Sequence, residues 1–79
     1  MRILNDESNE KLDNVSIFLT REEAIQFRGY LNQLLENPKL HHSHLSSSDY
    51  KKEITICIYE EDNITSFNER SRKLILNDE

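Results

Sequence analysis

The sequence predicts an α+β fold, a two-layer domain in which one long helix covers a face of a mostly antiparallel sheet of three or four strands. Three observations lead to this class. A helix-capping pattern precedes a helical repeat over residues 21–36, strand-like apolar runs occupy residues 15–19 and 53–59, and a second capping pattern begins a short C-terminal helix. The elements follow the order ββαββα, and a chain of 79 residues is expected to form one domain, residues 1–79.

The first two strands are predicted at residues 2–4 and 15–19. The second run is rich in β-branched and aromatic residues, and alternation would place Val15, Ile17 and Leu19 on one face. Residues 5–14 between them are almost entirely polar. We therefore expect the two strands to pair across a long exposed loop.

The long helix is predicted to begin after Thr20. Thr20 and Glu23 have the spacing of a capping box, in which each side chain accepts a hydrogen bond from the other residue's backbone N–H. The Asn37-Pro38 pair ends the helix, because a proline ring disfavours helical geometry at the residue before it. At 100° per residue, one apolar arc should face the sheet and contain Ala24, Phe27, Tyr30, Leu31, Leu34 and Leu35.

A hairpin is predicted after this helix. Residues 53–59 form the strongest strand, with Ile54, Ile56 and Ile58 on the face toward the helix, and residues 40–45 form the other arm. The serines and the aspartate of residues 46–50 favour the turn between them. An alternative for the first arm is a short helix with Asn37 as its cap and proline in its first position.

The C-terminal helix is predicted to start at Thr65 or Ser66, because Ser66 and Glu69 again have capping-box spacing. Phe67 and Leu74 would share its apolar face. Three basic residues would then lie near its last turn and complement the negative end of the helix dipole, namely Arg70, Arg72 and Lys73.

All three histidines of the chain fall within residues 41–44. A hairpin closing around residues 47–50 would pair Ser46 with Lys51, His44 with Glu53, His42 with Thr55, and Leu40 with Cys57. The face away from the helix would then hold His42, His44, Glu53, Thr55, Cys57 and Tyr59, with His41 turned toward the helix. A slip of one residue would exchange the two faces.

Two histidines at positions i and i+2 of a strand, with a carboxylate on the next strand, suggest a metal site. His42, His44 and Glu53 are the candidate ligands for zinc, nickel or iron, and a divalent metal of this kind is the one cofactor the sequence suggests. The chain has no second His or Cys cluster that would close a structural zinc site. It also lacks a phosphate-binding loop, a nucleophile-elbow motif and a Cys-x-x-Cys pair, so we do not expect an enzyme.

The composition limits the classes of partner that we expect for the chain. A net charge of −5 disfavours nucleic acid as a partner, despite basic residues at Lys51, Lys52, Arg70, Arg72 and Lys73. No apolar run approaches the roughly 20 residues of a membrane span, and the N-terminal residues do not resemble a signal peptide. We therefore expect a cytoplasmic protein with no membrane association.

The uncovered face of the sheet is the candidate interaction surface. Phe18, Cys57 and Tyr59 would be partly apolar and exposed there, which favours dimerisation or binding of another protein. The function expected from the sequence is that of a small acidic interaction module of the inhibitor, immunity, anti-defence or regulatory type. The alternative is a ligand- or metal-binding domain that uses the His42 and His44 face.

The chain as a whole resembles small bacterial and phage proteins. The resemblance is carried by Leu19-Thr20-x-Glu22-Glu23-Ala24, His41-His42-x-His44, Glu53-Ile54-x-Ile56-x-Ile58-Tyr59 and Phe67-x-x-Arg70. It implies a microbial setting and no particular activity.

Overall fold

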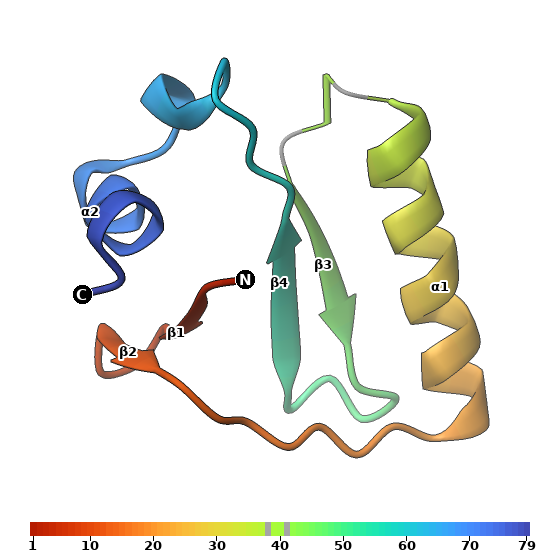
Figure 1. The fold of residues 1–79 in the computed structure, drawn as a ribbon. Helices are drawn as coiled ribbons and strands as arrows, with labels where there is room; N and C mark the ends of the chain where they lie inside the picture. The colour runs from red at the N-terminus through yellow and green to blue at the C-terminus, as the bar shows by residue number, and fades with distance from the viewer. Residues whose placement is uncertain (38, 41) are drawn as a thin grey trace. The chain divides into compact units, whose positions relative to one another are not determined.

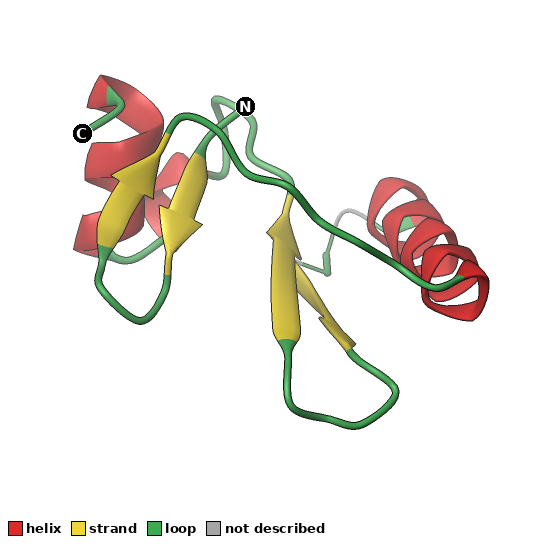
Figure 2. Ribbon diagram, turned by 90° about the horizontal axis from the view of Figure 1, so that it is seen from below, coloured by secondary structure: helices red, strands yellow, loops and turns green. Residues whose placement is uncertain are grey.

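A computed structural model describes residues 1–37, 39–40 and 42–79 of the chain. Their contacts divide them into two compact units. The central unit is Phe18–Ile58, and the terminal unit combines Met1–Ile17 with Tyr59–Glu79. The α+β class and the order ββαββα are confirmed, but the four strands form two separate two-stranded sheets rather than one sheet (Figures 1 and 2).

The central unit begins with the long helix α1 (Arg21–Glu36), which has the predicted bounds. The capping box is complete, because the Glu23 N–H donates to Thr20 Oγ1 (3.1 Å) and the Thr20 N–H donates to Glu23 Oε1 (2.9 Å). At the other end, the Asn37 N–H donates to the Gln33 carbonyl oxygen. The two polar groups that the sequence pairs at the start of the helix thus satisfy each other as expected.

Helix α1 packs against an antiparallel hairpin made of β3 (His42–Ser46) and β4 (Glu53–Cys57) (Figure 1). Leu34 and Leu45 form the core of this unit, at 3% and 2% exposure. Ala24 and Leu35 were predicted in the buried arc, but they are exposed. A hairpin of two strands is narrower than the expected sheet, and it leaves uncovered the edge of the apolar arc at which Ala24 and Leu35 lie.

The hairpin pairs His44 with Thr55 and His42 with Cys57, a shift of two residues from the predicted register. The turn lies one residue later than expected, because Ser47 still pairs with Lys52: the Ser47 N–H donates to the Lys52 carbonyl (2.9 Å), and the Lys52 N–H donates to Ser47 Oγ (3.0 Å). Tyr50 takes a positive φ of 59° within the turn. A shift of two keeps every side chain on its face, so the predicted division of faces is retained for the described residues.

The terminal unit starts with a short hairpin of β1 (Ile3–Asn5) and β2 (Glu10–Leu12). The predicted partner of the first strand, residues 15–19, is wrong, since that stretch forms no strand. The Asn5 residue explains why β1 pairs with β2. Its side-chain Oδ1 accepts the Glu7 and Ser8 N–H groups, and its carbonyl accepts the Asn9 N–H (2.8 Å). A turn built by an asparagine closes a much shorter loop than the predicted one, at a smaller entropy cost.

The second helix, α2 (Glu69–Asn77), follows a short 3-10 helix, η1 (Ile64–Ser66). The predicted start at residue 65 or 66 is wrong, because Phe67 is extended and Asn68 caps the helix by accepting the Ser71 N–H at 2.8 Å. Leu74 is the buried residue of this helix. No basic residue lies in its last turn, so the predicted complement of the helix dipole by Arg70, Arg72 and Lys73 is also wrong.

Across the part of the chain that the structure describes, no helix is both long enough and apolar enough to cross a membrane.

Candidate functional site

Two histidines stand side by side on the open face of the β3–β4 hairpin. His42 and His44 are two residues apart on β3, and both are exposed on the side opposite α1. Their ring centres are 4.9 Å apart, and the rings meet edge to face at 75°. The strand therefore brings two imidazoles together, as the sequence predicts. His41 was predicted to turn toward the helix and lies outside the described residues.

The His44 ring is held by two side chains of β4. Its Nδ1 lies 2.8 Å from Glu53 Oε1 and 2.9 Å from Thr55 Oγ1. Thr55 is the direct cross-strand neighbour of His44, and Glu53 reaches it diagonally from beside Ser46. Because an ionised carboxylate only accepts hydrogen bonds, the Glu53 contact places a proton on His44 Nδ1. In the neutral ring, the lone pair then lies on Nε2, the ring nitrogen that does not contact Glu53.

The predicted ligand set of His42, His44 and Glu53 is thus brought together, with Glu53 beside the inner nitrogen of His44. Among the described residues, no group of three or more His, Cys, Asp or Glu side chains has the arrangement of a metal site. This hairpin therefore offers two imidazoles rather than three ligands, and metal binding stays a prediction.

The predicted partner surface of Phe18, Cys57 and Tyr59 takes a different form. Phe18 is 92% exposed and precedes α1 outside any strand, whereas Cys57 is exposed on the outer face of β4. Tyr59 follows β4 and belongs to the terminal unit. The three residues do not share one sheet face, because the strand that was to carry Phe18 does not form.

The sequence interpretation missed the exposed apolar stretch at residues 15–19, here called the apolar segment. Figure 1 shows it running from β2 to α1 without forming a helix or a strand. Val15 and Ile17 are about half exposed (53% and 50%), Phe18 is almost fully exposed, and Leu19 is also exposed. The asparagines at positions 5 and 9 were the available signal, since they favour a tight turn that leaves the segment without a strand partner.

Glu23 has a second role that local sequence patterns do not reveal. Its side chain is only 9% exposed, and Oε2 accepts the Ser48 N–H at 3.0 Å, while Oε1 accepts the Thr20 N–H. These backbone hydrogen bonds, from Thr20 first and Ser48 second, lower the pKa of the Glu23 carboxyl. One carboxylate therefore joins the start of α1 to the turn of the hairpin.

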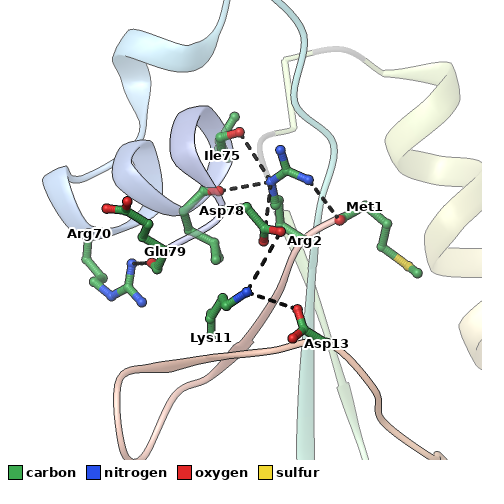
Figure 3. Close-up of polar contacts among 9 residues, drawn as sticks. Met1, Arg2, Lys11, Asp13, Arg70, Ile75, Asp78 and Glu79 are labelled. Atoms are coloured by element: carbon green, nitrogen blue, oxygen red, sulfur yellow. Dashed lines mark hydrogen bonds and ion pairs between the residues drawn. The ribbon is translucent and has the colours of Figure 1, made fainter.

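The basic side chains of the terminal unit mostly bind the chain itself (Figure 3). Arg2 Nε donates to the Leu74 and Ile75 carbonyl oxygens at 3.0 and 3.3 Å, at the C-terminal end of α2. Arg70 donates to the Asn9 and Glu79 carbonyls. These contacts use part of the hydrogen-bonding capacity of both guanidinium groups.

Lys11 forms a small charge cluster with two aspartates. Its Nζ lies 3.1 Å from Asp13 Oδ1 and 4.0 Å from Asp78 Oδ2 (Figure 3). The hydrogen bond to Asp13, together with the charges of both carboxylates, raises the pKa of Lys11. Lys11 therefore stays charged, and this surface is balanced rather than basic.

Neither a protein-family model, nor a curated protein sequence, nor a solved structure matches this chain. Its own residues are therefore the basis for assigning a function.

Proposed function

We propose that this protein is a small interaction module that binds another polypeptide through the apolar segment, and that the polypeptide is a second copy of the same chain. The observation that supports the proposal is the exposure of Val15, Ile17, Phe18 and Leu19 in one short stretch that only Ser16 interrupts. Exposed apolar residues scattered singly are normal on a protein surface, but a contiguous run is typical of a binding site.

The composition of the apolar segment suits pairing with another strand. Three of its five residues are β-branched or aromatic, namely Val15, Ile17 and Phe18, and these residue types fit a pleated surface. A segment of this kind without a strand partner can gain backbone hydrogen bonds by pairing with a second polypeptide.

The segment is also complementary to itself. In an antiparallel pair centred on Ile17, Ile17 would lie opposite Ile17 of the second copy, and Val15 would lie opposite Leu19. Three apolar cross-strand pairs would then share one face. Such a contact uses the same surface on both copies, which is the arrangement of a two-fold symmetric dimer.

Charges at the two ends of the segment support the same pairing. Asp13 and Arg21 are equally distant from Ile17 in the sequence, so the pair would bring Asp13 of one copy near Arg21 of the other, twice. Opposite charges across an interface fix its register more than they strengthen it. The net charge of −5 on each copy opposes nonspecific association. Dimerisation therefore needs a register that brings opposite charges together.

Sedimentation velocity at concentrations from micromolar to millimolar tests the proposal. We expect the wild-type chain to form dimers as the concentration rises, and Ile17→Asp to remain monomeric because it places two carboxylates opposite each other. Tyr50→Asp is the matched control, since it also replaces an exposed apolar residue (87% exposed) and aspartate tolerates the positive φ there. A wild-type chain that stays monomeric, or an Ile17→Asp chain that still dimerises, would contradict the proposal.

A charge exchange tests the register. Arg21→Asp should weaken dimerisation by roughly three- to tenfold, the size expected for two exposed ion pairs, and the double variant Asp13→Arg with Arg21→Asp should recover it. Aspartate in the first turn of α1 favours the helix, so weaker association would not arise from a damaged fold. Equal dimerisation of the single and double variants would rule out this register.

A further inference from the structure

We propose that His42 and His44 form a binding site for a divalent transition-metal ion, with zinc as the first candidate, and that Glu53 positions the His44 ring without contacting the metal. The ligands are imidazoles, which bind zinc, nickel and copper well. The site lies on β3 in the central unit and uses none of the residues of the apolar segment, so it does not rest on the proposed dimerisation.

The spacing of the two rings is compatible with a pair of metal ligands, and it is also that of an ordinary edge-to-face ring contact. Alternate residues of a strand have Cα atoms about 6.7 Å apart and point to the same face. Zinc lies about 2 Å from each imidazole nitrogen in a tetrahedral site, which places the centres of two ligand rings about 5 Å apart. The observed separation of 4.9 Å between the rings of His42 and His44 agrees with this value. The backbone of β3 therefore already provides the spacing.

Glu53 sets the form of His44 that a metal requires. Its carboxylate accepts the proton of His44 Nδ1 at 2.8 Å, so the lone pair of the neutral ring lies on Nε2. Imidazole ligands in metal sites typically donate their other N–H to a carboxylate or a carbonyl, which fixes the ring and raises its basicity. Thr55 Oγ1, 2.9 Å from the same nitrogen, restricts the ring further.

The open face leaves room for other ligands. Both histidines are exposed, with half of the His44 side chain accessible to solvent, so water can fill the remaining coordination positions. No third described residue joins them in a metal-binding group. We therefore expect one ion per chain, held less tightly than in a closed structural site with four protein ligands.

Isothermal titration of the tag-free chain with zinc chloride tests the ligands. We expect one zinc ion per chain and at least tenfold weaker binding in His42→Ala and in His44→Ala, with unchanged far-ultraviolet circular dichroism because both side chains are on the surface. Absence of zinc uptake by the wild-type chain would overturn the site, as would His42→Ala and His44→Ala variants that bind zinc as tightly as the wild-type chain. Each titration is repeated with Ile17→Asp, so that an effect of dimerisation is separated from an effect of the metal ligands.

The role of Glu53 is tested with Glu53→Ala, and Glu22→Ala on the exposed side of α1 serves as the matched loss of one carboxylate. We expect Glu53→Ala to weaken zinc binding by about 10- to 100-fold, the usual effect of removing such a partner, and Glu22→Ala to leave it unchanged. The ¹⁵N chemical shifts of the His44 ring should report a proton on Nδ1 in the wild-type chain and a shift toward Nε2–H in Glu53→Ala. Unchanged ring shifts and unchanged affinity in Glu53→Ala would exclude the positioning role.

Discussion

At the scale of single residues, Glu23 is the clearest case of a side chain with both a local and a distant partner. Each carboxylate oxygen accepts a backbone N–H, from Thr20 at the start of α1 and from Ser48 in the hairpin turn. A buried polar group is tolerated when it is hydrogen-bonded, and each oxygen of this carboxylate has a partner. The glutamate of the capping box thus also joins the hairpin turn to the start of the helix.

The lowered pKa of Glu23 predicts how stability depends on pH. A carboxyl whose pKa is lower in the folded chain contributes its full stabilisation above the unfolded pKa of about 4.3, and loses it as the pH falls through the folded value. We expect the difference in unfolding free energy between the wild-type chain and Glu23→Gln to be largest near pH 7 and to shrink below about pH 4.

Urea denaturation at a series of pH values measures this difference for Glu23→Gln. Glu22→Gln, which removes the neighbouring exposed carboxylate, is the control. Glutamine is also accepted at this position of a capping box, so the helix should persist in Glu23→Gln. A difference that grows as the pH is lowered would contradict the assigned hydrogen bonds.

At the scale of elements, local signals were sufficient for α1 and insufficient for the strand partners. The helix was predicted with its observed bounds because its cap and its apolar repeat lie within one continuous stretch. The face of the β3–β4 hairpin followed from period-two alternation, whereas its register depended on which serine closes the turn. The predicted partner of β1 was wrong, because a turn built by a nearby asparagine pairs β1 with β2 rather than with a better strand sequence farther along the chain.

The end of α2 is a second case in which local sequence patterns were not sufficient. The sequence places three basic residues near this helix, but the cation at its C-terminal carbonyls is Arg2, which is 72 residues away from Leu74 in the chain. Arg2 also lies 3.8 Å from Asp78, the residue in left-handed conformation that ends the helix. Contacts between residues so far apart in sequence have no local signature.

Removal of the Arg2 side chain should therefore loosen the end of α2. A cation at a helix C-terminus contributes about 0.3–1 kcal/mol, so we expect Arg2→Ala to lose roughly that much and to speed amide hydrogen exchange at residues 75–78. Arg28→Ala, on the exposed side of α1, is the control and should leave these amides unchanged. Unaltered exchange at residues 75–78 in Arg2→Ala would show that the contact does not stabilise the helix.

At the scale of the whole molecule, the length of the chain predicts one domain, whereas the contacts form two compact units. Each unit has its own buried leucines: Leu34 and Leu45 in the central unit, and Leu74 in the terminal unit. Cores this small leave little reserve of stability, because the conformational entropy lost on folding grows with every ordered residue. In a single domain, a destabilising substitution in one core would also destabilise the other core. In two separate units, it would destabilise only the unit that carries it.

Two core variants distinguish the descriptions. Truncation of a buried leucine costs about 2–5 kcal/mol, so Leu45→Ala should greatly reduce amide protection in residues 18–58, and Leu74→Ala should do so in residues 1–17 and 59–79. Because each leucine belongs to a different compact unit, we expect native-state hydrogen exchange to show the loss mainly in the unit that carries the substitution. If either variant lowers protection equally in both units, the chain unfolds as the single cooperative domain that its length predicts, and the contacts within each unit are not sufficient to hold it alone.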